Sequence, residues 1–190
     1  MIQPLIDSQQ FSNLNFSIDP LPKAEYDNCT FTNCDFTNTD LSNSLFVECR
    51  FDTCNLSNAN VSHTIWREVE FLDCKLIGLQ FHEINPFLMS FNFINCQLQF
   101  SSFLRLKLKA VNFQNCNLNQ VNFTEADLSN GIFECCDFKH AIFDHTILNN
   151  CDLSTSENFS ISPDSNNIKG AKFSKENILG LLHTYQISIV

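Results

Sequence analysis

Large apolar residues recur at every fifth position through most of the chain. The series begins at Tyr26 and reaches Phe81 without an exception, then resumes two residues out of phase at Phe93 and continues to Leu153. A smaller residue, most often Cys, Ala, Ser or Thr, stands two positions before the large one, and the flanking positions are mainly polar. A period of five fits neither the helical period of about 3.6 residues nor strict alternation. The pattern therefore predicts a repeat architecture in place of helices or ordinary strands.

The period is interrupted once, between the two series. Pro86 stands in this segment and has no N–H to donate to a strand ladder, so we expect a bulge or a small loop. Two interpretations stay open: a tolerated two-residue insertion, or a loop that contacts a partner. The residues of the candidate loop are Asn85, Pro86, Phe87, Leu88 and Met89.

The interruption and two irregular ends divide the chain into five segments. Residues 1–25 contain Pro20 and Pro22 and are expected to form an irregular first turn of the array or a cap. Regular repeats fill residues 26–83 and 93–172, the last of them degenerate, with the break at 84–92 between them. Residues 173–190 are expected to form a helix with Ser174 as N-cap, followed by a short strand from Gln186 to Val190.

The C-terminal segment carries several apolar side chains that need a cover. One interpretation docks them on the last repeats of the same chain, and the other pairs two copies through this end with two-fold symmetry. We expect the second arrangement, a homodimer. The residues of this candidate interface are Ile178, Leu181, Leu182, Tyr185, Ile187 and Ile189.

The formal net charge of −10 comes from 21 acidic and 11 basic side chains. A surface of this sign repels duplex DNA and anionic membranes, because both are bound by releasing counterions to basic side chains. We therefore expect no nucleic-acid partner and no membrane partner, and a basic protein surface instead. The N-terminus has no basic region and the chain has no long apolar run, so the protein is expected to be cytoplasmic.

Nine of the ten cysteines, all except Cys135, fall on the small position of the repeat. In a reducing compartment we expect them to be buried thiols that act as small apolar side chains. The run from Cys135 to His140, with His145 nearby, has a weak likeness to a zinc site, but the register points Cys136 inward and both histidines outward. No phosphate-binding glycine loop, nucleophile elbow or HExxH motif occurs. The sequence thus predicts no metal, no cofactor and no enzyme activity.

The stretch from Phe31 to Asn43, FTNCDFTNTDLSN, resembles the pentapeptide-repeat family, and the resemblance covers about residues 26–155. It implies an all-β fold, a right-handed quadrilateral parallel β-helix in which each pentapeptide forms one side and four form a coil. The large and small positions would then point inward together and fill a narrow core. Neighbouring coils would pair their backbones about 4.8 Å apart.

Within that family, the chain resembles the topoisomerase-protecting branch, which includes the quinolone-resistance Qnr proteins, MfpA and McbG. The likeness rests on the acidity, the number of coils and the ending of the chain, and from Phe91 onward it is greatest with microcin immunity proteins of the McbG type. The resemblance implies a rod-shaped homodimer joined at its C-termini, whose acidic surface resembles duplex DNA. Such a protein binds DNA gyrase or topoisomerase IV and relieves poisoning by quinolones or peptide toxins.

A type II topoisomerase would meet the acidic side chains of this rod. In the first half they are expected on two adjacent sides, while Arg105, Lys107 and Lys109 gather near one corner. The candidate partner-binding acids are Glu25, Asp27, Glu48, Asp52, Glu68, Glu70, Asp73, Glu125, Asp127, Glu134, Asp137, Asp144 and Asp152. The large paired loops of many Qnr proteins are missing, which favours protection against a peptide or natural-product toxin over protection against quinolones. The alternative function is an interaction scaffold for another protein partner.

Overall fold

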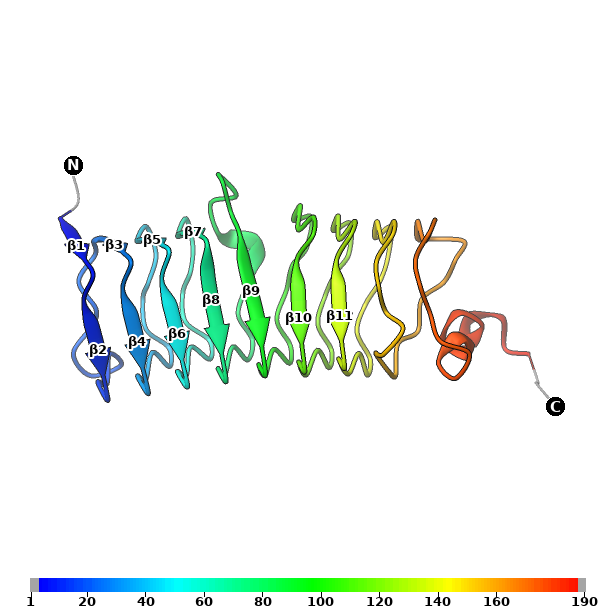
Figure 1. Ribbon diagram of the computed structural model, residues 1–190, viewed down its shortest axis with the longest axis horizontal. Coiled ribbons are helices and arrows are strands. Elements are labelled where there is room, and N and C mark those ends of the chain that lie inside the picture. Colours follow the sequence, from blue (N-terminus) through cyan, green and yellow to red (C-terminus); the bar gives the residue numbers. More distant parts are fainter. Residues whose placement is uncertain (1–3, 188–190) are drawn as a thin grey trace.

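The computed structural model describes residues 4–187 as a parallel β-solenoid whose coils follow one another along a single axis (Figure 1). Each short strand pairs in parallel with its equivalents one coil before and one coil after, at a constant offset along the chain. Tyr26, for example, lies opposite Phe46, and Phe46 lies opposite Trp66. Since this offset equals four repeats of five, the expected fold class, a parallel β-helix built from pentapeptides, is confirmed.

Two adjacent sides of the solenoid carry strand ladders (Figure 1). The β1 side is formed by β1 (Leu5–Asp7), β3 (Glu25–Asp27), β5 (Leu45–Val47) and β7 (Ile65–Arg67). The β2 side is formed by β2 (Gln10–Ser12), β4 (Thr30–Thr32), β6 (Arg50–Asp52), β8 (Val69–Leu72), β9 (Phe91–Ile94), β10 (Asn112–Gln114) and β11 (Ile132–Glu134). The third and fourth sides are joined by isolated bridges, such as Asp35 to Asn55 and Asp40 to Asn60.

The residue before the large position largely determines which sides form strand ladders and which form isolated bridges. On the third and fourth sides it is often Asn or Asp, whose side-chain oxygen accepts a hydrogen bond from the backbone N–H two residues later. Asp35 Oδ1 accepts in this way from the Thr37 N–H at 2.9 Å and from the Thr37 hydroxyl at 2.6 Å. An Asx turn competes with extended backbone, so these sides are turns and not strands. The second bond, from the hydroxyl to the Asx oxygen, also explains why Ser or Thr follows the large residue.

Corners are made by single residues with left-handed backbone, one at the end of each side. Their φ angles are positive, as at Asn28 (50°), Asn33 (52°) and Asn38 (55°). Asn tolerates this region better than most side chains, because its short polar group can bond locally. Only Gly78 and Gly170 of the described glycines occupy it, so a chain with few glycines turns its corners with Asn more often than with any other residue.

The core is a set of columns of stacked side chains. The Phe31 ring lies between Phe11 and Phe51, with ring centroids 4.8 Å away on each side. All 25 large positions that the sequence identifies are buried, and Phe46, Phe51, Phe113 and Phe123 are fully so. Rings at this spacing combine apolar burial with an offset stacking contact, so each coil stabilises its neighbours.

The small inward position is filled by side chains that can donate one hydrogen bond. The Cys54 thiol lies 3.3 Å from the carbonyl oxygen of Phe31, one coil earlier. The Thr64 hydroxyl donates to Leu41 O at 2.9 Å, and the Thr146 hydroxyl donates to Phe123 O at the same distance. A small donor at this place satisfies a buried carbonyl without adding bulk, which accounts for the interchange of Cys, Ser and Thr.

The interruption lengthens one coil by two residues. Val69 of β8 pairs with Phe91 of β9, two positions beyond the regular offset, whereas β9 and β10 return to it. The extra residues leave the β1 side as a projecting loop, preceded by the 3₁₀ helix η1 (Phe81–Glu83) (Figure 1). The insertion is thereby absorbed on one side, and the other sides keep their register.

The two ends differ from the sequence expectation. At the N-terminus, β1 and β2 already stand in register with β3 and β4, so residues 5–12 follow the regular ladder. At the C-terminus, the expected helix and strand are replaced by a turn at 175–177 and two 3₁₀ helices, η2 (Ile178–Leu181) and η3 (His183–Tyr185). Ser174 still begins this segment, because its hydroxyl accepts from Asn177 N–H while Asn177 Oδ1 accepts from Ser174 N–H. Gln186 and Ile187 are not in a strand, and residues 188–190 lie outside the described range.

Removing one stacked ring should leave a cavity that the neighbouring coils cannot close. We expect Phe113→Ala to lower the free energy of unfolding by about 3–5 kcal/mol, the usual cost of Phe→Ala in a core. Phe100→Ala is the matched control, because Phe100 lies on a corner and is 56% exposed; it should change stability little. Urea denaturation of both variants checks this, and equal losses would contradict the stacked core.

Candidate functional site

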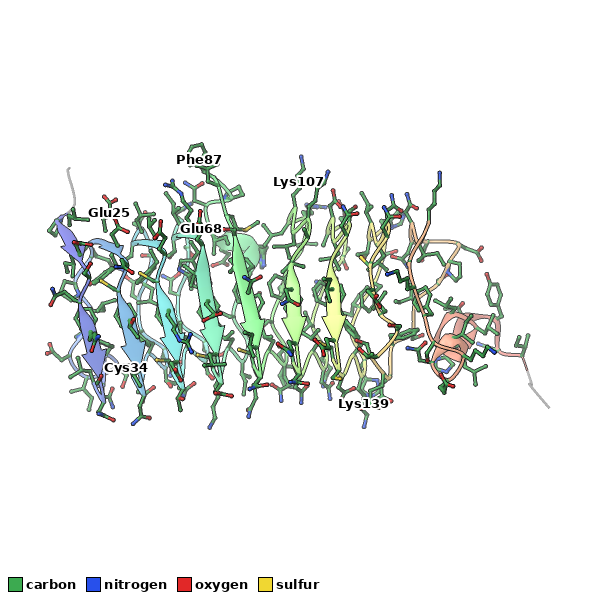
Figure 2. All side chains as sticks on the ribbon, in the orientation of Figure 1. Glu25, Cys34, Glu68, Phe87, Lys107 and Lys139 are labelled. Atoms are coloured by element: carbon green, nitrogen blue, oxygen red, sulfur yellow. The ribbon has the colours of Figure 1, made fainter. Side chains whose placement is uncertain are left out.

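The negative charge is concentrated in the first half of the rod. Residues 1–83 contain 12 acidic and 4 basic side chains, whereas residues 93–172 contain 8 and 6. Glu25 and Asp27 of β3, with Glu48 and Glu68 on the following corners, lie along the β1 side. Figure 2 shows Glu25 and Glu68 on the same edge of the rod. Asp52, Glu70 and Asp73 lie on the β2 side.

Several carboxylates of the first half have no cationic neighbour. Glu70 lies 2.8 Å from Arg50, and Asp52 lies 3.4 Å from the same guanidinium. Among the described residues, no basic group lies within 4 Å of the other five candidate acids of this half, which are Glu25, Asp27, Glu48, Glu68 and Asp73. Their charge is therefore open to a partner.

The candidate acids of the second half are more often neutralised by bases of the same chain. Glu125 lies 2.9 Å from Arg105 and Asp127 lies 3.4 Å from Lys109. Asp152 lies 3.3 Å from Lys172, and Asp144 lies 2.9 Å from the His145 ring. Asp137 accepts from the Asn158 amide at 2.8 Å, and no base lies within 4 Å of Glu134 in the described chain. These six acids are spread over all four sides, so they do not form one surface.

Hydrogen bonds also hold some of these carboxyls in the charged form. The Arg105 guanidinium lowers the pKa of Glu125, and the Ser154 hydroxyl, with Lys172, lowers the pKa of Asp152. Partial burial opposes the charge on Asp127, yet bonds from Ser129 and Lys109 lower its pKa. A lowered pKa means that these groups remain ionised well below neutral pH.

The candidate loop projects from the β1 side with two apolar side chains at its tip. Phe87 is 61% exposed and Leu88 is 59% exposed, and the backbone of Leu88 is left-handed with φ of 53°. Asn85 Oδ1 accepts from the Phe87 N–H at 3.0 Å and shapes the turn, with Pro86 exposed between them. Met89 turns back and packs against the core.

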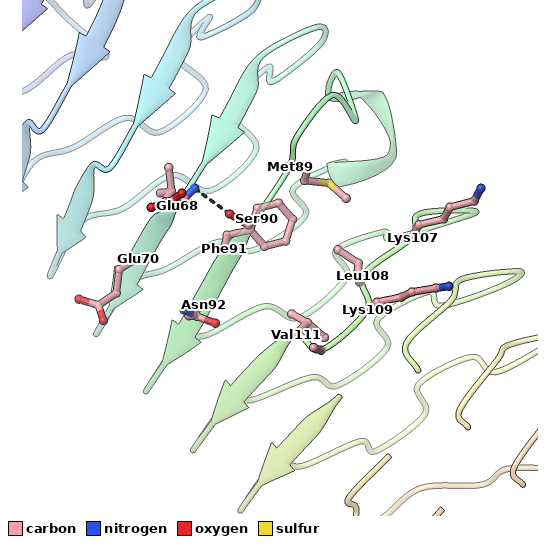
Figure 3. Close-up of a pocket in the computed structure, with 12 residues that line it drawn as sticks. Glu68, Glu70, Met89, Ser90, Phe91, Asn92, Lys107, Leu108, Lys109 and Val111 are labelled. Carbon is pink, nitrogen blue, oxygen red and sulfur yellow. Dashed lines mark hydrogen bonds between the residues drawn. The ribbon is translucent and has the colours of Figure 1, made fainter. Parts of the chain in front are cut away.

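A groove of about 420 Å³ lies between the returning leg of this loop and the next coil (Figure 3). Met89, Ser90 and Phe91 form one wall, and Lys107 to Val111 form the other. Glu68 and Glu70 stand at its edge, and the Ser90 hydroxyl accepts from the Glu68 N–H at 2.8 Å. The groove thus has a mixed polar and apolar lining between acidic and basic margins.

The C-terminal segment docks on the last coil of its own chain. Gly180 is buried against Phe159, and a Cβ at this position would lie 2.4 Å from the Phe159 carbonyl oxygen. Ile161 N–H donates to Gly180 O at 3.0 Å, and the Asn177 side chain donates to Leu153 O and Ser156 O, each at 2.9 Å. Only a residue without a side chain fits so close to this backbone.

Docking leaves part of the candidate dimer interface exposed. Leu181 packs against the core and Leu182 is half-buried, whereas Ile178, Tyr185 and Ile187 are between 45% and 57% exposed. Leu179, which the sequence did not single out, is 45% exposed beside them. Ile189 lies outside the described residues. Both interpretations of the sequence therefore stay open: the segment is docked on its own chain, and an apolar surface remains that a second copy could cover.

The thiols follow the repeat register. Nine cysteines are buried and free, and Cys135 is exposed on a corner. Burial raises the pKa of Cys49 to about 12 and that of Cys151 to about 11. A hydrogen bond with Cys136, together with burial, raises the pKa of Cys116 to about 12. No group of residues suited to hold a metal ion occurs within residues 4–187.

Two family models match most of the repeat array. One, described as "Pentapeptide repeat region", matches residues 6–81, and the other, "Pentapeptide repeats (8 copies)", matches residues 92–130 and 122–156. The chain belongs to the pentapeptide-repeat family. The boundary between the two matches falls on the loop. No curated protein sequence matches this pentapeptide-repeat protein.

Solved structures of QnrB1 share the fold. Full-length QnrB1, titled a plasmid-mediated fluoroquinolone resistance protein, matches with a TM-score of 0.58 and 18% identity over 96% of this chain and 100% of QnrB1. A trypsin-treated variant of QnrB1 matches with a TM-score of 0.50 and 19% identity over 100% of this chain and 99% of that one. HetL from the cyanobacterium Nostoc sp. strain PCC 7120 matches with a TM-score of 0.39 and 14% identity, covering 90% and 88% of the two chains. At these identities the likeness to QnrB1 shows the fold alone.

The helices of the described chain include none that is both long and apolar enough to cross a membrane.

Sequence reasoning missed two features of the site. It did not identify Gly180 as the docking point, because that role depends on a contact with Phe159 that no local pattern encodes. It did not pair acids with bases, although Arg50 with Glu70 and Arg105 with Glu125 stand one full coil apart in the sequence.

The burial of the thiols makes a direct prediction for their reactivity. Because the thiolate is the reactive form and burial disfavours it, native protein should show one fast thiol towards a disulfide reagent at about pH 8, Cys135, and nine slow ones. Cys135→Ser should remove the fast phase, and Cys136→Ser should leave it unchanged. Two or more fast thiols in the native protein would show that the core is open.

Proposed function

We propose that this pentapeptide-repeat protein binds the basic DNA-binding surface of a type II topoisomerase, DNA gyrase or topoisomerase IV, and protects the enzyme from a poison. The observation that carries the proposal is the series of five carboxylates without a cationic neighbour on two adjacent sides of a rigid rod, Glu25, Asp27, Glu48, Glu68 and Asp73. Binding, not catalysis, would be its activity. Action in the cytoplasm agrees with ten free cysteines.

The physical basis is competition for a positive surface. Coils spaced about 4.8 Å apart hold the carboxylates at fixed positions, so little side-chain or backbone ordering is lost on binding. Duplex DNA carries one charge for about every 1.7 Å of its axis, which is denser than this surface provides. The rod would therefore rely on steering by its whole field of −10 per chain, and on rigidity, more than on matching each phosphate.

The projecting loop supports protein binding and narrows the class of poison. Phe87 and Leu88 at its tip are apolar anchors that a protein partner could bury. With only this short loop, a peptide toxin of the microcin type is the proposed poison ahead of quinolones, in keeping with the sequence resemblance to McbG-type immunity proteins. The fold shared with QnrB1 agrees with either poison.

The acidic surface can be tested against charge changes of equal size elsewhere. We expect purified protein to restore gyrase supercoiling in the presence of a peptide toxin or a quinolone, and the variant with Glu25→Gln, Glu48→Gln and Glu68→Gln to need roughly tenfold more protein, because steering depends on local charge. The control with Glu125→Gln, Asp144→Asn and Asp152→Asn removes the same charge from paired acids and should have a smaller effect.

This function would be refuted if the fully folded protein bound neither gyrase nor topoisomerase IV at low salt and rescued neither enzyme. The alternative, a scaffold for another protein partner, would then remain. Equal losses in the two triple variants would show that net charge matters and that the two acidic sides of the first half do not.

We also propose that two copies pair through the C-terminal end. Ile178→Asp combined with Leu179→Asp places charge in the apolar surface and should convert a dimer to a monomer in light scattering at tens of micromolar. Ile132→Asp is the control, because Ile132 is 52% exposed on the β2 side and lies outside the C-terminal segment. A monomeric natural protein would refute the dimer and leave the topoisomerase proposal standing.

A further inference from the structure

Three side chains on the outside of the β1 side form an apolar cluster. Leu45 and Val47 share the outward face of β5, and Ile65 of β7 lies opposite Leu45. All three are half-buried. In the same half of the described chain, the strands of the β2 side carry a single apolar residue outward, Leu72. The repeat does not need apolar side chains at outward positions, so the cluster points to a contact with another molecule.

The projecting loop stands at one end of this apolar cluster. In its first leg, Asn85 N–H donates to Thr64 O at 2.9 Å. In its second leg, Ser90 N–H donates to Trp66 O at 3.1 Å, so both legs lie beside β7. Figure 2 shows Phe87, at the tip, projecting beyond the acidic edge of the rod. The outer face of the β1 side therefore ends in a raised apolar step directly after the coil of β7.

Carboxylates border the apolar cluster on two of its other margins. Glu25 and Asp27 of β3 lie one coil before it, opposite its two β5 residues. Glu48 and Glu68 lie on the corners that follow β5 and β7. None of the four has a basic group within 4 Å in residues 4–187, and one base, Arg67, stands among them without an ion pair in the same range. The margin is therefore strongly negative around an apolar centre.

The strand ladder leaves only side chains for a partner to bind on this face. β5 pairs with β3 on one side and with β7 on the other, so its backbone groups are already bonded. From β3 to the loop the face spans three coil steps of about 4.8 Å, or roughly 14 Å. A helix of about ten residues has that length, and it can carry an apolar stripe with basic residues on both borders. Helices bind other proteins through such stripes.

Charge decides among the possible occupants of this face. A second copy of the chain would bring the same carboxylates against the first set, and like charges oppose such a contact. An anionic membrane or a nucleic acid is repelled for the same reason. A helix with lysine or arginine beside its apolar stripe places opposite charges on the negative margin and apolar residues on the centre, which is the usual arrangement of a protein interface.

We propose that the β1 side, from β3 to the loop, binds a short amphipathic helix with basic borders that belongs to a partner protein. The apolar stripe of the helix would cover Leu45, Val47 and Ile65 and pack against Phe87, while its basic residues would face the carboxylates of β3 and of the two corners. This binding mode rests on the proposed function, because it uses four of the same acids. It adds that the partner contributes apolar side chains, so that the contact is not one of charge alone.

A model peptide tests this binding mode on the intact protein. The probe is a capped helical peptide of about 14 residues, with leucine at helical spacing on one side and lysine elsewhere. Calorimetric titration should show binding, and a peptide of the same composition with its leucines spread around the helix should bind at least about tenfold more weakly, which corresponds to about 1.4 kcal/mol. Equal binding of the two peptides would mean that charge alone attracts them, and no binding of the probe at millimolar concentration would mean that the site does not exist; each overturns the proposal.

Matched double variants locate the site. Leu45→Thr with Ile65→Thr keeps side chains that suit a strand and should weaken the probe at least about tenfold. Leu72→Thr with Ile94→Thr is the control, because this half-buried outward pair lies face to face in the same way on the β2 side; it should leave the affinity unchanged. Equal losses in the two variants would overturn the proposal. Loss of a dimer in the first variant alone, seen by light scattering, would assign the face to a second copy and overturn it too.

A substitution at the loop tip tests the site without touching the strands. Phe87→Ser should weaken the probe, whereas Phe100→Ser, on a corner outside the β1 side and 56% exposed, should not. Both side chains are exposed, so both variants should fold even if a double variant does not. Unchanged binding by Phe87→Ser would remove the loop from the site and overturn the proposal.

Gyrase rescue by the same natural protein separates this proposal from the proposed function. Rescue without binding of the probe would overturn the helix site and leave the proposed function standing. Binding of the probe as expected, without rescue of gyrase or topoisomerase IV, would support the helix site and assign it to a different partner protein.

Discussion

Each inward side chain stacks on its equivalent one coil away, and the rest of the structure depends on this contact. Phe93, Phe113 and Phe133 follow one another at 4.8 and 5.2 Å. Stacking of this kind is favourable only if consecutive coils have equal length, so the same offset is imposed on every side. Equal coils then place a left-handed residue at each corner and align the outward residues in rows. The outside of the rod is regular because its core is.

The sequence predicts the inside of this molecule better than its ends. A period of five translates directly into burial, and every large position from Tyr26 to Leu153 is inward. The C-terminal segment was harder, because the 3₁₀ turns there depend on Gly180 fitting against Phe159, a contact between distant residues. The path of the loop was also beyond prediction. Two surplus residues indicate a loop, but nothing local says which neighbouring coil its legs will pair with.

The surface divides its chemistry along the axis. The first half displays carboxylates without cationic neighbours, the middle carries the loop with Phe87 and the free cation Lys107, and the last coil carries an apolar end. The sign of the net charge could be read from the composition. Where unpaired charge lies on the surface, however, depends on ion pairs between neighbouring coils, such as Arg50 with Glu70. A protein of this form can present different partners with different regions without moving, because every region is held by the same core.

Because the offset between coils is constant, the length of this molecule can change only in steps of one whole coil. Duplicating one whole coil would extend the rod by a single step of about 4.8 Å and leave every outward row in phase. Any other number of added residues would be expelled sideways, as the pair at Phe87 and Leu88 is. The distance between two docking regions and the chemistry of each region could therefore evolve separately, because the number of whole coils alone sets the distance.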